Sequence, residues 1–252
     1  MQHINRLRLV TFDVTETLLN FRVPPAEKYV EVGAQFGVSV DAKAINANLK
    51  KQWRYMSSRH PNFGQSTGLG WERWWKQLVN QTFQETVKCK AFDVSILDTI
   101  GEHLVEIYKT SECWQTMEGA KELLKCLNTL NIPVGIISNN DERLETVLKT
   151  MELHQYFQFI ITSYSAGFEK PDPRIFHLAL CGLRNSSVKP NEALHVGNLP
   201  ETDYIGAVNA GWNAALVHQN AKNVIEHYND IDPELVFETL KDLQSYVTTF
   251  HN

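Results

Sequence analysis

The sequence predicts an α/β protein that has a doubly wound parallel sheet with an all-helical module inserted into it. From about residue 114 onward, short apolar runs alternate with amphipathic helical patterns, which is typical of parallel strands joined by helices. Residues 22–110, by contrast, show helical patterning without a convincing strand. We therefore predict a core domain formed by residues 1–21 and 111–252 and a helical domain formed by residues 22–110.

The first predicted strand carries an acid at its end. Residues 7–12 are mostly apolar or β-branched, and Asp13 follows them directly. A buried strand that ends on a carboxylate places that group at the carboxyl edge of the sheet, where open α/β sheets bind their ligands. We take Asp13 as the centre of the candidate site.

The helical module is predicted from residue spacing and turn formers. Pro24 and Pro25 end the first strand region, and Asp41 is a candidate N-cap. A turn-rich stretch covers residues 60–70, and Trp71, Trp74 and Trp75 recur at helical spacing. We expect helices at 26–36, 42–57, 71–83 and 92–110. Because this module leaves the chain just after the first strand, we expect it to lie over the carboxyl ends of the strands.

The rest of the chain is expected to build the sheet and its covering helices. We predict strands at 133–137, 157–162, 193–196 and 214–218, and helices at 118–130, 142–151, 172–183, 203–210 and 233–246.

Composition and charge limit the possible partners. The chain has 252 residues, 43% of them apolar and 21% charged, with a net charge of −5. This balance gives no electrostatic reason to bind nucleic acid or an anionic membrane. It leaves a small phosphorylated metabolite possible as a partner, because a local site can differ in sign from the whole chain. The oligomeric state stays open.

The lack of a long apolar segment and the spacing of the cysteines lead us to expect a reducing compartment. No segment reaches about 18 consecutive apolar residues, and the N-terminus has no long apolar stretch. We therefore expect a cytoplasmic protein, with a nuclear or mitochondrial address left open. The four cysteines lie far apart without CxxC spacing, so we expect reduced, mostly buried thiols rather than a disulfide framework or a zinc site.

Four polar stretches follow predicted strands, at residues 13–17, 138–140, 170–173 and 197–203. The carboxyl ends of parallel strands meet at one edge of the sheet, so these stretches should converge on one crevice. Together they supply a carboxylate nucleophile, a hydroxyl, an ammonium and oxygen ligands for a metal. A phosphoryl group beside a carboxylate needs such a set, because a cation and hydrogen-bond donors must offset the repulsion.

The order of these motifs resembles the haloacid dehalogenase (HAD) superfamily with a C1 cap, over nearly the whole chain. The motifs are Asp-x-x-x-Thr, a strand followed by Ser, Lys-Pro-Asp-Pro, and Gly-Asn followed by Asp after four residues. The segments DVTETLLNFRVPPAEKY, HPNFG, WWKQL, IYKTSECW and EKPDPRIF further resemble the animal HAD-like hydrolase domain-containing protein 3 group. The resemblance implies a Rossmann-like core, a helical cap and an Mg²⁺-dependent phosphatase that forms an aspartyl-phosphate.

The resemblance implies a role for residues in each of the four motifs. Asp13 would be the nucleophile, Ser138 would hydrogen-bond a phosphate oxygen with Asn139 beside it, and Lys170 would pair with Asp13 and the phosphate. The metal ligands would be Asp13, the backbone carbonyl of Thr15, Asn198 and Asp203. Taken alone, Ser138 could be a turn or N-cap residue and Asp203 could cap the following helix.

Two residues depart from the family pattern. Thr15 stands where active phosphatases usually have a second Asp, which protonates the leaving group and later activates water. Positioned acid–base groups contribute about 10²–10⁴-fold, or roughly 3–5 kcal/mol of barrier. Asn198 stands where the pattern has Asp, which removes one charge from a hard-cation site, so we expect Mg²⁺ to bind weakly. With fewer carboxylates nearby, we expect Asp13 to ionise easily beside Lys170.

Several residues could replace the missing acid or contact the substrate. Glu16 is adjacent in sequence but should point differently from Thr15. His60 lies in the turn-rich loop, and histidine is a common side chain for proton transfer near neutral pH. Arg22 and Arg73 are candidates for an anionic substrate tail. The tryptophans at 71, 74 and 75 are expected to pack between helices rather than to form a ligand cage.

We therefore predict a HAD-like hydrolase, specifically a weak or narrow Mg²⁺-dependent phosphatase that acts through Asp13. The alternative is a catalytically impaired protein that keeps the fold to bind a phosphorylated ligand or another protein. A minor alternative is dehalogenase-type hydrolysis of a carbon–halogen bond, which also uses an Asp nucleophile.

Overall fold

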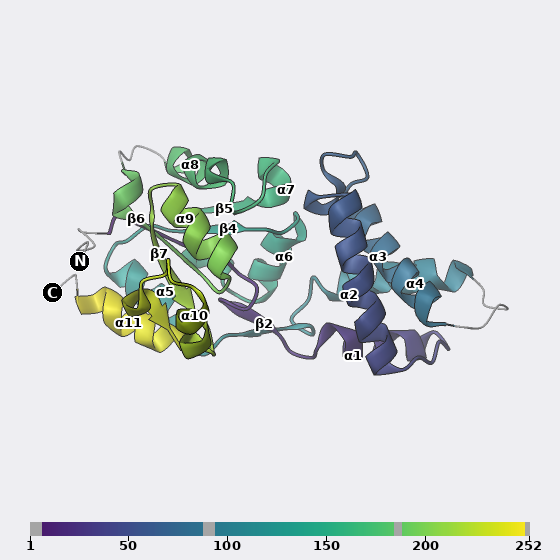
Figure 1. Cartoon of the computed structure of the whole chain (residues 1–252). Helices are drawn as coiled ribbons and strands as arrows, with labels where there is room; N and C mark the ends of the chain where they lie inside the picture. The colour runs from purple at the N-terminus through teal and green to yellow at the C-terminus, as the bar shows by residue number, and fades with distance from the viewer. Residues whose placement is uncertain (1–6, 88–93, 184–187, 250–252) are drawn as a thin grey trace. The chain divides into compact units, whose positions relative to one another are not determined.

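The computed structural model describes residues 7–87, 94–183 and 188–249. The chain divides into two compact units, one formed by Met1–Asn20 with Gln115–Asn252 and the other by Phe21–Trp114. The first is an α/β unit and the second is helical (Figure 1). Two short strands, β2 (Leu19–Phe21) and β3 (Trp114–Thr116), pair where the chain passes from one unit to the other.

A parallel sheet forms the centre of the α/β unit, which confirms the predicted fold class. Among the described residues it contains β1 (Leu9–Phe12), β4 (Val134–Ser138), β5 (Phe159–Thr162), β6 (Ala193–Gly197), β7 (Asn213–Val217) and β8 (Val236–Phe237). Their order is β5-β4-β1-β6-β7-β8, and each described pairing is parallel. In this order β1 lies between β4 and β6, so the predicted nucleophile follows a central strand.

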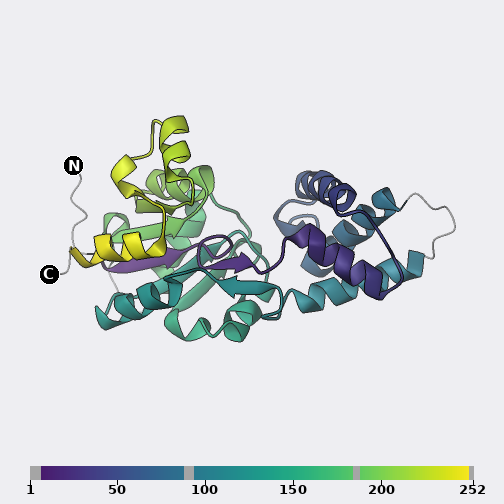
Figure 2. The same cartoon turned by 90° about the horizontal axis from the view of Figure 1, so that it is seen from below.

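The strands are buried because helices cover both faces of the sheet (Figures 1 and 2). All residues of β1, β4 and β6 are buried, as expected for parallel strands that read as continuous apolar runs. The covering helices are α5 (Ala120–Thr129), α6 (Arg143–Thr150), α7 (Ser163–Ala166), α8 (Pro173–Gly182), α9 (Gly206–Asn209), α10 (Ala221–His227) and α11 (Leu240–Thr249).

The helical unit contains α1 (Pro25–Gln35), α2 (Ala42–Arg59), α3 (Trp71–Thr86) and α4 (Val94–Ile107). The Asp41 side chain accepts a hydrogen bond from the Ala44 N–H at 2.9 Å, as its predicted N-cap role requires. Trp74 is buried and packs edge-on against Phe63 and Trp53, so it belongs to the packing between α2 and α3. Residues 92 and 93 of the predicted fourth helix lie outside the described residues.

The predicted helix over 233–246 is wrong over residues 233–239 and is confirmed from Leu240 onward. A 3₁₀ turn (Pro233–Leu235) comes first, because the Asp232 side chain accepts a hydrogen bond from the Glu234 N–H at 3.0 Å. Strand β8 then pairs with β7, and α11 begins only at Leu240. The predicted helix over 203–210 also differs: a π-helical segment (Pro200–Ile205) precedes α9. Alternation of apolar residues over so few positions could not separate a two-residue edge strand from a helix.

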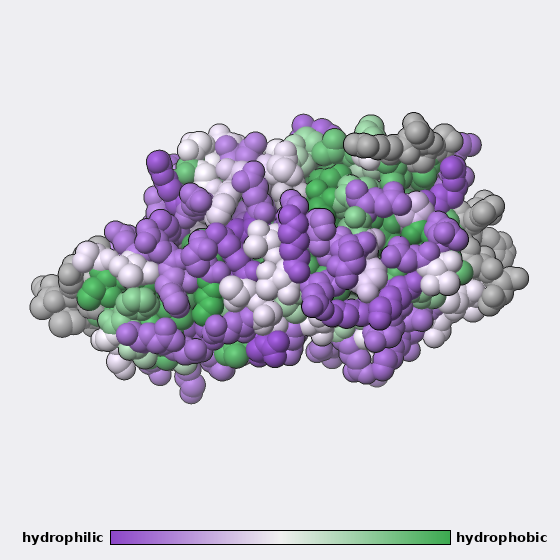
Figure 3. Space-filling view, turned by 180° about the vertical axis from the view of Figure 1, so that it is seen from behind, coloured by the Kyte–Doolittle hydropathy of each residue, from purple (hydrophilic) through white to green (hydrophobic). Residues whose placement is uncertain are grey.

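Figure 3 shows polar residues spread over the visible face, with hydrophobic residues visible between them on both units. Within the described ranges, no helix is long and apolar enough to cross a membrane.

Of the free cysteines, Cys113 is buried, Cys126 is half-buried and Cys181 is exposed, so the expectation of mostly buried thiols is wrong. Cys89 lies outside the described residues.

Candidate active site

Three predicted motifs begin at the carboxyl ends of adjacent strands. Asp13 follows β1, and its N–H donates to the carbonyl of Val196 in β6 at 2.8 Å. Ser138 is the last residue of β4, and Gly197 is the last residue of β6. The parallel register therefore brings these residues to the same edge of the sheet as Asp13.

Lys170 joins two carboxylates in the interior. Its Nζ donates to Asp13 Oδ1 at 2.9 Å and to Asp203 Oδ1 at 2.6 Å. The side chains of Lys170 and Asp203 are each 1% exposed, and that of Asp13 is 12% exposed. The three charges are thus nearly removed from water, while the exposed part of Asp13 gives a reactant access.

Asn139 positions the backbone of Lys170. Its Oδ1 accepts from the Lys170 N–H at 2.7 Å, and its Nδ2 donates to the Lys170 carbonyl at 2.9 Å. We predicted this side chain as a phosphate contact, but its amide is instead engaged by the loop that carries the lysine. The hydroxyl of Ser138, which is 2% exposed, hydrogen-bonds the Asp13 carboxyl.

Both carboxylate oxygens of Asp203 have protein partners. Oδ1 accepts from Lys170, and Oδ2 accepts from the backbone N–H groups of Asn198 and Leu199 at 3.1 and 2.9 Å. These donors precede Asp203, so the side chain does not cap the helix that follows. A Cβ at Gly197 would lie 2.2 Å from Asp203 Cγ, so this close approach requires glycine. That Asp203 faces a metal stays a prediction.

His195 is a buried member of this cluster that the sequence analysis missed. Its Nδ1 lies 2.9 Å from Thr11 Oγ1, its partner in the β1–β6 register. Its Nε2 lies 3.3 Å from Asp203 Oδ1 and 3.4 Å from Lys170 Nζ. The sequence does offer one indication of this position. His195 lies two residues before Gly197, and this spacing puts both residues on the same face of β6.

Burial sets the ionisation of the cluster. It raises the pKa of Asp13 above its usual range, more than the Lys170 ammonium lowers it, so the expectation that Asp13 ionises easily is wrong. Burial lowers the pKa of Lys170, but the two carboxylates reverse this and hold the lysine charged. For Asp203, burial is outweighed by Lys170 and by a hydrogen bond with His195, and its pKa is lowered. Burial and the nearby ammonium lower the pKa of His195 to about 4.

The turn after Asp13 contacts Asn198. Thr15 is half-buried and forms a bridge with Leu19. Glu16 Oε2 accepts from Asn198 Nδ2 at 3.1 Å, and the Thr17 hydroxyl donates to Asn198 Oδ1 at 3.4 Å. The side chain of Asn198 is therefore held by the motif that also carries the predicted nucleophile.

The other predicted contacts belong to the helical unit. His60 Nδ1 lies 2.9 Å from Thr67 Oγ1, and Arg22 Nη2 donates to the Trp114 carbonyl at 3.1 Å, so both are described within that unit. Their contact with a substrate stays a prediction, as does the placement of the helical module over the strand ends.

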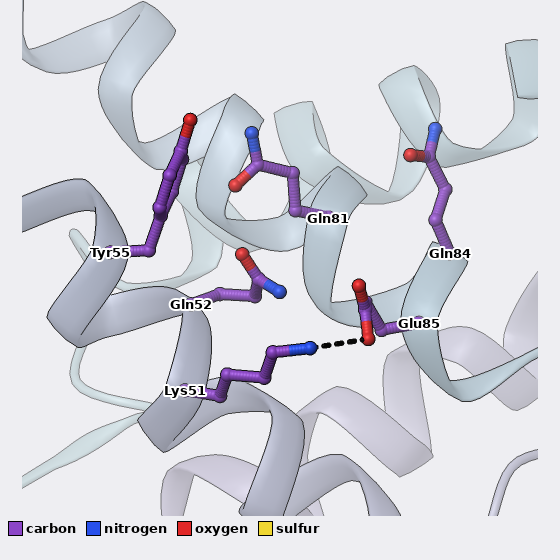
Figure 4. A pocket seen from close by; sticks show the side chains of 6 residues that line it. All are labelled: Lys51, Gln52, Tyr55, Gln81, Gln84 and Glu85. Atoms are coloured by element: carbon purple, nitrogen blue, oxygen red, sulfur yellow. Dashed lines mark hydrogen bonds and ion pairs between the residues drawn. The ribbon is translucent and has the colours of Figure 1, made fainter. Parts of the chain in front are cut away.

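A polar groove lies between α2 and α3 (Figure 4). It has a volume of about 470 Å³ and is lined by Lys51, Gln52, Tyr55, Gln81, Gln84 and Glu85. Lys51 Nζ donates to Glu85 Oε2 at 2.8 Å, which joins the two helices across the groove. The residues predicted as functional are not among those that line it.

Family membership follows from comparison with known proteins. The model of the haloacid dehalogenase-like hydrolases matches residues 7–211. The chain belongs to this family. The "Rhythmically expressed gene 2 protein" of Drosophila melanogaster is 42% identical over 98% of both chains. "Haloacid dehalogenase-like hydrolase domain-containing protein 3" of Bos taurus is 36% identical over 86% of this chain and 84% of its own length. These relatives confirm the predicted subgroup.

Solved structures support the fold of the family. The HAD hydrolase YfnB from Bacillus subtilis, described as putative and bound to magnesium, is similar with a TM-score of 0.66 over 97% of this chain and 100% of its own. Its sequence is 16% identical, so this similarity concerns the fold alone.

We predict that His195 makes stability depend on pH. Because its pKa is about 4 in the folded chain and about 6.5 when unfolded, the unfolded state binds more protons between these values, and stability falls as pH falls through this window. The free energy of unfolding should drop by roughly 3 kcal/mol more in the natural chain than in His195→Gln between pH 7 and pH 4. Urea unfolding at each pH measures this.

The exposed His177 provides the matched control for this change. His177→Gln should keep the pH slope of the natural chain. Equal slopes for the natural chain and His195→Gln would contradict the prediction.

Proposed function

We propose that the protein is a weak or narrow Mg²⁺-dependent phosphatase that acts through an aspartyl-phosphate on Asp13. One observation carries the proposal: the carboxylate at the end of the central strand is hydrogen-bonded to a buried ammonium at 2.9 Å. An ammonium in this position can offset the charge of an incoming phosphoryl group, which a lone buried carboxylate would repel.

The reaction proposed has two displacements. An Asp13 oxygen attacks phosphorus, the bond from phosphorus to the leaving oxygen breaks, and that oxygen departs with the bonding electrons. Water then attacks phosphorus, the bond to Asp13 breaks, the carboxylate is restored, and the proton of water passes to solvent. The Ser138 hydroxyl and the Lys170 ammonium are the donors available to phosphoryl oxygens, since both touch the Asp13 carboxyl.

Mg²⁺ would be held by oxygen atoms of the motifs at Asp13 and Asn198, which carry little negative charge. We propose the Asp13 carboxylate, the Thr15 carbonyl and the Asn198 amide oxygen as ligands, an all-oxygen set of the kind that Mg²⁺ prefers. Within the described residues, no group of three or more His, Cys, Asp or Glu side chains is placed to hold a metal. Asp203, the fourth ligand expected, already accepts hydrogen bonds at both oxygens, one of them from Lys170. When bound, Mg²⁺ would neutralise charge on the phosphoryl oxygens.

The substrate class follows from what Thr15 lacks. A threonine hydroxyl neither protonates a leaving oxygen nor deprotonates water near pH 7. Leaving groups that depart without protonation should therefore be favoured, and we propose an acyl phosphate or an activated phosphate monoester among small cytoplasmic metabolites. We propose no nucleic acid or membrane partner, given the net charge of −5.

A second candidate function is ligand binding without turnover. Thr15 and Asn198 favour it, since the first withholds proton transfer and the second reduces metal charge. A screen of phosphate esters with Mg²⁺ would separate the two functions, because a binding protein would hold a phosphorylated ligand tightly and release no phosphate.

We predict that Asp13→Asn reduces Mg²⁺-dependent phosphate release to the level of a blank, because an amide oxygen does not form the covalent intermediate. Phosphate release from acetyl phosphate measures this. Asp230→Asn, which changes an exposed acid, is the control and should keep full activity. Release that survives in Asp13→Asn would show that Asp13 is not the nucleophile.

We also predict that Thr15→Asp raises turnover of poor leaving groups by up to about 10²–10⁴-fold, because it restores a positioned acid–base group. Thr15→Ser, which adds no acid, should leave turnover near its natural value. The comparison of kcat for an alkyl phosphate and for acetyl phosphate measures the effect. An equal kcat for Thr15→Asp and Thr15→Ser would mean that proton transfer is not what limits the reaction.

A further inference from the structure

Glu16 makes a contact that the proposed reaction does not use. Its Oε2 accepts a hydrogen bond from Asn198 Nδ2 at 3.1 Å, although the two residues are 182 positions apart. Asn198 is 5% exposed, whereas Glu16 is exposed. An exposed carboxylate thus reaches a nearly buried amide just after the end of β6.

The backbone of Glu16 is in an uncommon conformation. Its φ is +60°, in the left-handed region that favours glycine, asparagine and aspartate. Its N–H donates to the Leu19 carbonyl at 2.7 Å, which closes the turn after Asp13. A glycine would adopt this conformation more easily, so the turn alone does not explain a glutamate here. Backbone outliers of this kind gather at functional sites, where the surrounding structure holds them in place.

Glu16 also decides which way the Asn198 amide points. The side chain has a donor end, Nδ2, and an acceptor end, Oδ1, and a flip would exchange them. The Thr17 hydroxyl, 3.4 Å from Oδ1, can donate or accept and so tolerates either orientation. An ionised carboxylate can only accept, so Glu16 holds Nδ2 toward itself and leaves Oδ1 as the atom available to a cation.

The charge balance of the site gives Glu16 a second effect. Lys170 is paired with both Asp13 and Asp203, and the Asn198 side chain is neutral. The Glu16 carboxylate adds a negative charge next to Asn198. Position 198 is the one at which the family pattern has an aspartate. Groups that orient a metal ligand through its other polar atom are known to tune metal affinity.

We propose that Glu16 is a positioning residue of the cation site, which orients the Asn198 amide and supplies the negative charge that an asparagine lacks at this position. This inference rests on the proposed Mg²⁺-dependent function. It assigns Glu16 no contact with the reacting phosphorus and no transfer of a proton. It also explains how a turn with a strained, charged residue can serve a site that has lost one carboxylate.

The test is a titration of the full chain with Mg²⁺ by isothermal calorimetry. Glu16→Gln keeps the shape but removes the charge and the fixed preference for a donor, and Glu16→Gly also relieves the backbone. Both should weaken Mg²⁺ binding about 10–100-fold, the usual effect of removing such a partner. Glu16→Asp keeps the charge and should bind more tightly than Glu16→Gln. Glu226→Gln, which removes an exposed charge on α10, should bind like the natural chain.

Thermal unfolding without metal separates this role from a merely structural one. Glu16→Gly should be at least as stable as the natural chain and still lose Mg²⁺ affinity. An unchanged Mg²⁺ affinity in Glu16→Gln and Glu16→Gly would overturn the inference, and so would a natural chain that binds no Mg²⁺.

Phosphate release by the same samples distinguishes the two proposals. Weaker Mg²⁺ binding in the Glu16 variants, together with no release by the natural chain, would support the role of Glu16 and contradict the phosphatase function. Release that depends on Mg²⁺ and on Asp13, together with an unchanged Mg²⁺ affinity in Glu16→Gln, would support the phosphatase function and contradict the role of Glu16.

Discussion

The pairing of Lys170 with Asp13 and Asp203 is the interaction on which the site depends. Three charged groups are nearly excluded from water, and a buried charge that loses its partner costs about 3–5 kcal/mol. Other contacts keep the ammonium in place. Asn139 holds the Lys170 backbone, two N–H groups hold Asp203, and the absence of a side chain at Gly197 lets Asp203 approach. The sheet supplies the frame, since these parts meet where adjacent parallel strands end.

This arrangement suits the first half of a phosphoryl transfer better than the second. Asp13 keeps an ammonium and a hydroxyl beside it, so a phosphoryl group could be taken up. Thr15 offers no base to activate water for the return step. The buried His195 does not fill that gap, because its pKa of about 4 makes it a weak base and its ring nitrogens face Thr11 and Asp203. We therefore expect a slow second step, and an intermediate that persists.

Much of the fold and the centre of the site could be predicted from sequence. The central strands are largely apolar, and each ends in a polar motif, so both the sheet and its active edge could be predicted. The contacts of Asn139 with the Lys170 backbone could not be predicted, because a side-chain amide beside a phosphate motif serves a ligand or a backbone equally well in sequence. Lone residues such as His195 and Glu16 gave little signal, since their roles arise from strand register and from a contact across 182 positions. The short strand β8 was missed because two residues carry no period.

Mass spectrometry of the natural chain, quenched in acid after incubation with acetyl phosphate and Mg²⁺, tests the central claim most directly. A nucleophilic Asp13 without a nearby base should accumulate one phosphoryl group, and peptide mapping should place it on the peptide that contains Asp13. The adduct should be less abundant in Thr15→Asp, which could hydrolyse it. A chain that acquires no phosphoryl group, or that carries it on another residue, would contradict the account.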